Sequence, residues 1–259
     1  MYAIAMKLQK KGLVLLVVIA AVAGAIVWSQ KDTKNTHEVK IKEVNKQSQV
    51  KLPGSTIVKG ESHSTIDPTS LWVVVSKKYP LSDKGYRPTD LVLPKVAERA
   101  DKSDDEKSVR LSMAPALEQM LGDAGAAGHK LMLASGFRTY EQQQIYFDSY
   151  TAQFGREAAN KFSALPGESE HQTGLALDIA YQDMHDCYLD VCFGERPAGR
   201  WLAANAYKYG FTLRYPADKT AITQYQYEPW HFRFVGKELA LALHKSGLTL
   251  DEAKPYLDR

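Results

Sequence analysis

The sequence predicts an α+β domain in which helices pack on one side of a small, mainly antiparallel sheet. Strand-like and helix-like segments alternate irregularly over residues 67–259, and the connections between them differ in length. The chain has 259 residues, of which 44% are hydrophobic and 24% are charged. This balance is typical of globular proteins. It excludes a fully disordered chain, a collagen-like repeat and a protein with several membrane spans.

The first predicted element is a transmembrane anchor with a short cytoplasmic tip, over residues 1–29. Residues 12–28 form 17 consecutive positions without a charged or strongly polar side chain, after three lysines. This length is at the short end of what crosses a hydrocarbon core of about 30 Å. Trp28 suits the far interface, and the lysines place the N-terminus in the cytoplasm. The alternative is a signal peptide cleaved after the Ala-Val-Ala at 21–23, which would release a secreted protein.

Residues 30–66 are predicted to form a disordered tether, because they are rich in Lys, Ser, Thr, Asn and Gln and lack a sustained apolar period. The folded domain is expected over 67–259, and its first signal is a strand-like apolar run at 71–75. The chain carries a formal net charge of +3, and its excess of lysine lies before residue 67. The folded part is therefore slightly acidic, and we expect no nucleic-acid partner.

The elements of the folded domain follow from apolar patterns and helix-end signals. Acidic residues 104–106 suit a helix N-terminus, and the apolar period over 109–121 predicts a helix whose first turn Pro115 makes irregular. Thr139 and Gln142 resemble a capping box and predict another helix. Buried strands are expected at 130–135, 175–180, 211–215 and around 230–235, and further helices at 201–209 and 237–245.

Both cysteines, Cys187 and Cys192, lie in the part of the chain that is expected outside the cell. In an oxidising compartment they are most simply a disulfide that closes a tight loop. A pair of zinc ligands is the alternative, although a C-x4-C pair with no second pair nearby is weak evidence for one.

Two imidazoles and one carboxylate predict a metal site on the sheet. A catalytic zinc ion takes three protein ligands from His, Asp or Glu and keeps one open position. His171 would lie in a loop that turns at Gly174, and the strand at 175–180 would return Asp178 to the same place. Asp178 interrupts an apolar strand, so its carboxylate needs a partner, and a cation is a good one. His231 would be the third ligand of one zinc ion.

A general base and an anion-binding side chain are predicted beside this site. Glu228 lies three residues before His231, where a carboxylate could take a proton from metal-activated water and pass it to a leaving amine. Residues i and i+3 of a flat strand face opposite ways, so this role requires a bend near Pro229-Trp230. Arg138 follows a Ser-Gly turn, where its guanidinium suits a substrate carboxylate or a developing oxyanion.

Each of these side chains alone has a simpler interpretation. A histidine in a polar loop is usually exposed, and a histidine between aromatic residues is usually half-buried and hydrogen-bonded. Asp178 could cap a turn, Glu228 could begin a strand, and Arg138 could pair with a surface acid. The combination is more specific than any single member, and the functional interpretation depends on it.

At these residues the sequence resembles the zinc D-alanyl-D-alanine carboxypeptidases of the VanY type. The family pattern S-x-H-x-x-G-x-A-x-D occurs at 169–178, and the E-x-W-H segment occurs at 228–231. The S-G-[YF]-R-[ST] segment occurs at 135–139, with Gln143 at the usual place after the arginine. The segment that contains Cys187 and Cys192 has no place in the general family pattern, which puts the accepted substrate length in question.

The resemblance covers roughly residues 71–240 and implies the metallopeptidase fold that is shared with lysostaphin-type enzymes. It also implies roles for individual residues: His171, Asp178 and His231 would bind one zinc ion, Glu228 would be the general base and acid, Arg138 would hold substrate charge, and Ser169 and Gln143 would contact the substrate.

The implied reaction is zinc-dependent hydrolysis of the C-terminal D-Ala-D-Ala bond of peptidoglycan stem peptides, a DD-carboxypeptidase activity. The alternatives with the same chemistry are an LD-carboxypeptidase that acts on tetrapeptide stems and an endopeptidase. An alternative of another class is a non-catalytic zinc-containing binding module, as in hedgehog-like relatives, but the presence of Glu228 argues against it. We expect a monomer whose catalytic domain is held outside the cell by its single-pass anchor.

Overall fold

The computed structural model describes residues 48–53, 57–60, 63–183 and 187–258. The predicted anchor lies outside these residues, as does the first part of the predicted tether. Among the described residues, none of the helices is long and apolar enough to cross a bilayer.

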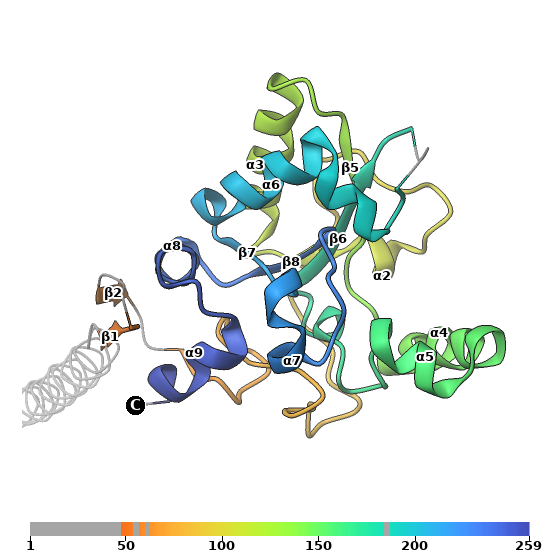
Figure 1. Cartoon of the computed structure of the whole chain (residues 1–259), viewed down its shortest axis with the longest axis horizontal. Helices are drawn as coiled ribbons and strands as arrows, with labels where there is room; N and C mark the ends of the chain where they lie inside the picture. Colours follow the sequence, from red (N-terminus) through yellow and green to blue (C-terminus); the bar gives the residue numbers. More distant parts are fainter. Residues whose placement is uncertain (1–47, 54–56, 61–62, 184–186, 259) are drawn as a thin grey trace, which may run out of the picture. The chain divides into compact units, whose positions relative to one another are not determined.

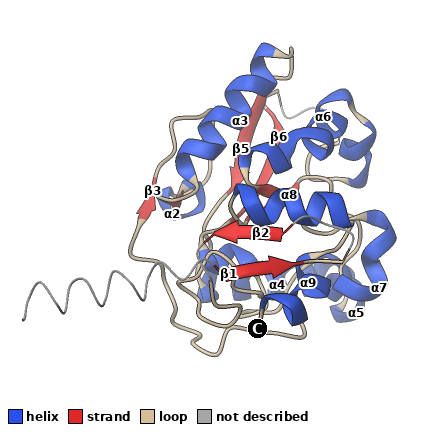
Figure 2. Cartoon of the chain, turned by 90° about the vertical axis from the view of Figure 1, so that its left-hand side faces the viewer, coloured by secondary structure: helices blue, strands red, loops and turns tan. Residues whose placement is uncertain are grey.

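Part of the segment that is predicted as a tether contains two strands. β1 (Ser48–Lys51) pairs antiparallel with β2 (Ile57–Gly60) (Figure 2). Leu52, directly after β1, is buried in a cluster with the C-terminal helices α8 (Lys237–Ser246) and α9 (Leu250–Leu257).

The centre of the domain is a four-stranded antiparallel sheet, which confirms the predicted α+β class (Figure 1). Nearly every position of its longer strands is buried, because these strands are short apolar runs covered on both faces. In spatial order the strands are β5 (Leu131–Ser135), β6 (Ala176–Tyr181), β8 (His231–Phe234) and β7 (Phe211–Leu213). A separate two-stranded sheet pairs β3 (Leu91–Val92) with β4 (Val109–Arg110).

Two helices cover one face of this sheet, namely α3 (Ala114–Ala126) and α6 (Pro197–Asn205). Leu177 and Phe232 share a core cluster with residues of both helices. Successive side chains of a strand point to opposite faces, so the neighbours of these residues, Asp178 and His231, point away from α3 and α6. The polar candidate residues of the sheet therefore lie on its other face.

The remaining helices are short except for α4 (Tyr140–Phe154), which begins where the sequence predicts it. Its N-cap, Thr139, accepts a hydrogen bond from the backbone N–H of Gln142 at 3.1 Å. Helices α4 and α5 pack side by side (Figure 1). The bounds of these elements are α2 (Asp104–Lys107), α4 (Tyr140–Phe154), α5 (Arg156–Phe162), α7 (Thr220–Thr223) and the 3-10 turns η1 (Glu170–Thr173), η2 (Val191–Glu195), η3 (Ala206–Tyr209) and η4 (Ala217–Lys219).

The strand predicted at 71–75 is wrong, because this segment is buried without joining a sheet. Its side chains alternate between two clusters. Val73 and Val75 pack with the central sheet, whereas Trp72 and Val74 pack with α8 and α9. The alternating burial therefore comes from a position between two cores and not from strand pairing.

The helix that was predicted to follow acidic residues 104–106 and to run through the apolar stretch up to residue 121 is divided. Helix α2 ends at Lys107, the next residues form β4, and α3 begins at Ala114. Pro115 explains why a new helix, α3, begins here, because its ring and missing N–H suit the first turn of a helix but not its interior.

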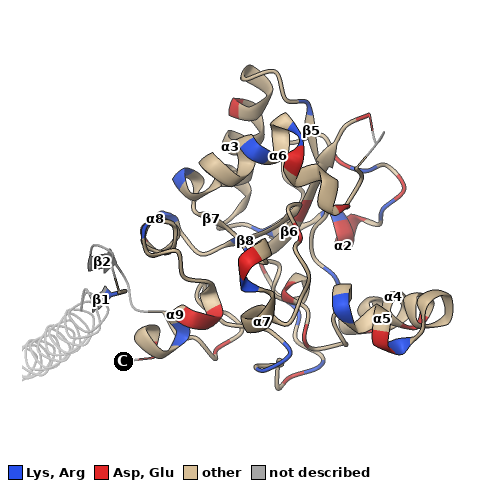
Figure 3. Cartoon of the chain, in the orientation of Figure 1, with Lys and Arg blue, Asp and Glu red and all other residues tan. Residues whose placement is uncertain are grey.

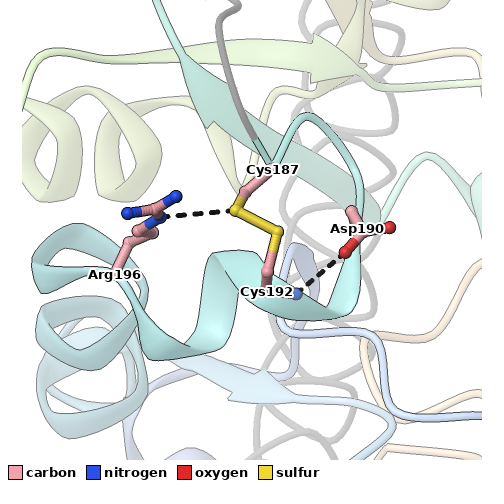
Figure 4. Close-up of a disulfide and its surroundings, with 4 residues drawn as sticks. All are labelled: Cys187, Asp190, Cys192 and Arg196. Atoms are coloured by element: carbon pink, nitrogen blue, oxygen red, sulfur yellow. Dashed lines mark hydrogen bonds between the residues drawn. A yellow bond between two sulfur atoms is a disulfide. The ribbon is translucent and has the colours of Figure 1, made fainter.

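The predicted disulfide between Cys187 and Cys192 is present (Figure 4). The backbone N–H of Cys192 donates to the Asp190 carboxylate at 3.0 Å, and Arg196 Nε donates to Cys187 Sγ at 3.3 Å. Leu189, inside the closed loop, lines the cleft that contains the candidate site residues. The disulfide therefore ties down one part of the wall of that cleft.

The chain after β5 passes close to the backbone that follows α2. The N–H of Gly136 donates to the carbonyl of Glu106 at 2.5 Å, and the N–H of Phe137 donates to the carbonyl of Ser108 at 2.8 Å. A Cβ atom on residue 136 would lie 2.3 Å from the Ser108 carbonyl oxygen. Only glycine fits at this position without movement of the backbone.

We expect Gly136→Ala to lower the free energy of unfolding by about 1–3 kcal/mol, because overpacking forces the backbone to shift. For a domain of this size the loss corresponds to a decrease in Tm of roughly 2–10 °C, measurable by differential scanning fluorimetry. Gly122→Ala on α3 is the matched control, since nothing lies within 4 Å of its added Cβ. The control should raise stability by up to about 1 kcal/mol, and a neutral or stabilising Gly136→Ala would contradict the close approach.

Candidate metal centre

Strand register brings the candidate ligands of the sheet together. In the β6–β8 ladder Asp178 lies directly opposite His231, and in the β5–β6 ladder it lies opposite Ser135. His171 belongs to η1, which ends at Thr173 and is capped by Gly174, with a φ of 67°, shortly before β6. This left-handed conformation favours glycine and allows the short reversal from η1 into the strand.

The structure brings His171, Asp178 and His231 together, with one ligand atom of each within 4.8 Å of the others. Nε2 of His171 lies 3.3 Å from Oδ2 of Asp178, and Nδ1 of His231 lies 3.2 Å from Oδ1. The two imidazole rings meet edge to face, with centroids 5.0 Å apart. All three side chains are buried. One nitrogen of each ring therefore converges with the carboxylate on a shared point.

The other ring nitrogen of His171 has a fixed partner. Nδ1 lies 2.7 Å from the carbonyl oxygen of Gly136. A carbonyl oxygen can only accept, so Nδ1 carries the proton and Nε2 keeps its lone pair for a metal. The close approach that requires glycine at residue 136 therefore also places the carbonyl that orients this histidine.

The chemistry of this group fits zinc. Two imidazoles and one carboxylate are a common set of three protein ligands for a catalytic zinc ion. Oδ1 of Asp178 is buried and has no hydrogen-bond partner among the described residues. Burial disfavours the charged form of His231, but the nearby carboxylates of Asp178 and Glu170 outweigh it and raise the pKa of this histidine to about 9. The site thus attracts positive charge, as a metal site must.

Glu228 reaches this group through the bend that the sequence requires. Pro229 and Trp230 form a turn, and the N–H of His231 donates to the carbonyl of Glu228 at 3.1 Å across it. Oε2 of Glu228 lies 3.9 Å from Nδ1 of His231. Burial, opposed by the attraction of His231, raises the pKa of the Glu228 carboxyl group to about 8. A carboxyl group with such a pKa can both accept and donate a proton near neutral pH.

Arg138 lies at the edge of the same group and is held by its neighbours. Its guanidinium donates to Oε1 of Gln143 at 2.8 Å and to Oγ of Ser135 at 2.9 Å, and it lies 3.9 Å from Oδ2 of Asp178. The ring of Tyr146 packs against it at 5.0 Å. Nε of Arg138 is buried and has no hydrogen-bond partner among the described residues.

Ser169 and Gln143 are both buried, and both line the cleft. The amide of Gln143 is already engaged, because it accepts from Arg138 and its Nε2 donates to the carbonyl of Ala164 at 2.8 Å. These contacts place Gln143 as a support for Arg138, in addition to the substrate contact expected of it from the sequence.

These residues line one common cleft. Besides the candidate residues, it is lined by aromatic side chains of α4, α5 and the segment before β8, namely Tyr150, Phe162, Tyr215, Tyr225 and Trp230. Acidic and basic residues are interspersed over the described elements (Figure 3).

Sequence reasoning missed the buried charges behind His231. Oε1 of Glu170 accepts from Arg214 Nε at 2.7 Å and from Arg233 at 3.0 Å, and none of the three side chains is exposed. A signal was present, because arginines interrupt two otherwise apolar strand segments. Arg233 follows His231 by two residues, which places both on the same face of β8.

Comparison with known proteins connects this geometry to a family. Residues 106–237 match the VanY family of D-alanyl-D-alanine carboxypeptidases. The YodJ protein of Bacillus subtilis is 39% identical over 237 residues, which are 86% of each chain. A D-alanyl-D-alanine carboxypeptidase of Enterococcus faecalis is 39% identical over 153 residues, which cover 56% of this chain and 54% of the enterococcal one.

Two solved structures resemble the domain with more than 30% sequence identity. The LD-carboxypeptidase LdcB is 38% identical with a TM-score of 0.66, over 80% of this chain and 92% of the other. A variant of the D,D-pentapeptidase VanY from a VanB-type vancomycin resistance cassette, in complex with Zn(II), is 32% identical with a TM-score of 0.56, over 72% and 98%. The family match covers half of the chain and the Bacillus relative covers most of it, so this protein belongs to the VanY family of D-alanyl-D-alanine carboxypeptidases.

Proposed function

We propose that this protein is a zinc-dependent carboxypeptidase that releases the C-terminal D-alanine of peptidoglycan stem peptides. The observation that carries the proposal is the meeting of His171, Asp178 and His231 with Glu228 in one cleft. Membership of the VanY family and the Zn(II) in a 32% identical relative support the metal. A structure of the relative VanYB in complex with D-alanine-D-alanine supports the class of substrate.

In this proposal Nε2 of His171, the Asp178 carboxylate and Nδ1 of His231 hold the zinc ion. Bound zinc supplies Lewis acidity and lowers the pKa of a water molecule to about 7. Glu228 takes a proton from the attacking water on its carboxylate and gives that proton to the amine of the departing D-alanine. A pKa raised by burial suits Glu228 to keep the proton between the two transfers.

In this proposal the guanidinium of Arg138 binds the negative charge of the substrate. That charge is the terminal carboxylate or the oxyanion that develops during attack. Ser135 and Gln143 hold the guanidinium at the edge of the cleft. Recognition of a terminal carboxylate favours a carboxypeptidase over an endopeptidase, because an internal bond offers no such charge. Ser169, which lines the cleft, is assigned a contact with the substrate.

A C-terminal D-alanine can be released from two kinds of stem peptide, by cleavage of the DD bond of a pentapeptide or of the LD bond of a tetrapeptide. The comparisons favour one of these two bonds. The sequence predicts cleavage of the D-Ala-D-Ala end of a pentapeptide, with the LD bond of a tetrapeptide as the alternative. The LD-carboxypeptidase LdcB resembles this chain more closely than the VanY D,D-pentapeptidase does, with a TM-score of 0.66 against 0.56. We therefore place the tetrapeptide stem first.

We further propose that the domain acts outside the cytoplasm. Peptidoglycan lies there, and the apolar segment at 12–28 after three lysines supports an anchor with the domain on the outer side. The disulfide between Cys187 and Cys192 supports an oxidising compartment.

Glu228→Gln should reduce kcat by about 10²–10⁴-fold, because the amide keeps the volume of the side chain but cannot accept a proton. The protein should keep one zinc ion, as measured by elemental analysis. Glu157→Gln is the control, since that carboxylate is 95% exposed on α5, and it should act at the wild-type rate. A zinc-loaded Glu228→Gln protein with wild-type kcat would rule out the assigned base.

Defined tripeptide, tetrapeptide and pentapeptide stems, incubated with the protein and read by mass spectrometry, test the choice of bond. We expect loss of one D-alanine from the tetrapeptide and no cleavage of its C-terminally amidated form, which lacks the charge that Arg138 binds. A strong chelator should stop the reaction and added zinc should restore it. Cleavage of the pentapeptide alone would support the DD bond, and full activity in chelator would contradict the proposed use of zinc.

A further inference from the structure

Two buried polar atoms without partners face each other behind the candidate metal centre. Oε2 of Glu170 lies 3.6 Å from Nε2 of His231. Both atoms are buried, and neither has a hydrogen-bond partner among the described residues. Buried polar groups are almost always paired, so two unpaired atoms that point at each other indicate a contact that the complete site uses.

We propose that Glu170 is a positioning residue that holds the ring of His231 with Nδ1 toward the metal. The inference rests on the proposed zinc site. A carboxylate can only accept a hydrogen bond, so a carboxylate at Nε2 requires the proton on that nitrogen and leaves the lone pair on Nδ1. A carboxylate behind a ligating histidine also increases the basicity of the ring and fixes its orientation.

The two histidines would then be held in matching ways by different groups. Nδ1 of His171 faces the carbonyl of Gly136, which leaves Nε2 for the metal. Nε2 of His231 faces Glu170, which leaves Nδ1 for the metal. The ring of Tyr215 packs against His231 at a centroid distance of 4.9 Å, so the imidazole is restrained from its face as well as from its edge.

Glu170 can do this because its own position is fixed by charge. Its other oxygen accepts from Arg214 at 2.7 Å and from Arg233 at 3.0 Å. Arg214 is held in turn by Asp251 at 2.5 Å, and Arg233 donates to the carbonyl of Leu71 at 3.0 Å. Rotation of the carboxylate would leave the buried guanidinium group of Arg233 without its anion and Arg214 with Asp251 alone, which is strongly unfavourable.

The network is also balanced in charge. Glu170 and Asp251 offset Arg214 and Arg233, so these four charges, three of them fully buried, sum to zero beside a site that is expected to hold a divalent cation. Without Glu170, two arginines behind His231 would repel that cation. The carboxylate therefore has two effects on the site, one on the orientation of a ligand and one on the local potential.

Glu170→Gln in the full-length protein tests the role. The amide can donate to Nε2 of His231 and so favours the proton on Nδ1, the wrong nitrogen for binding. We expect the zinc dissociation constant, measured by competition with a chelator, to rise about 10–100-fold. In saturating zinc we expect kcat to fall while KM for the peptide stays within about twofold, because Glu170 contacts His231 and the two arginines, and the charge of the substrate is assigned to Arg138. Glu170→Asp, which keeps the charge, should recover part of the zinc affinity.

Asp251→Asn is the matched control, because it breaks the same arginine network on the side away from His231. It should lower Tm and leave the zinc dissociation constant within about threefold of wild type. If Glu170→Gln lowers Tm in the same way and binds zinc as wild type does, Glu170 is only a structural ion-pair partner and the proposal is overturned. Absence of zinc from the wild-type protein would instead overturn the proposed function.

A second measurement needs no variant and decides the matter if Glu170→Gln fails to fold. Long-range ¹H–¹⁵N NMR spectra of zinc-loaded wild-type protein, labelled at histidine, report which nitrogen of each ring is protonated. We expect a protonated Nε2 and a metal-bound Nδ1 for His231, and the reverse for His171. A metal-bound Nε2 or a protonated Nδ1 on His231 would overturn the proposal.

Discussion

The pairing of β6 with β8 places Asp178 beside His231, and the geometry of the candidate site depends on this register. A shift by one residue would turn one of these side chains toward α3 and α6, into the apolar core. Leu177 and Phe232, which are buried on that face, oppose such a shift. The same period of two that builds the core therefore keeps the two ligands side by side on the other face.

The architecture also depends on the pairing of its buried charges. Taking an ionised group out of water is expensive unless a partner compensates for it. Glu170 has two arginines, and the pKa of Asp178 lies well below its usual range because the attraction of two histidines outweighs burial. Arg233 and His231 share one face of β8, so the ion network of the core and the candidate metal centre are parts of one structure.

Several features depend on contacts between distant segments and were not predictable from local patterns. The run at 71–75 alternates in burial as a strand does, yet it lies between two clusters. Gln143 has the position of a substrate-binding residue in the family pattern, and in the fold its amide supports Arg138. Glu170 follows Ser169 in a motif that draws attention to His171, and only the fold connects it to the arginines behind His231.

The sequence by itself determined the class of fold, the main strands and the group of residues that meets in the cleft. Its apolar periods and the spacing of its His, Asp and Glu motifs carry that information locally. Tertiary structure alone decided how these residues meet. Which imidazole nitrogen faces the site is set by Gly136 and Glu170. The physical reason is that hydrogen-bond partners and buried charges pair across 35 to 63 positions of sequence, beyond the reach of any local pattern.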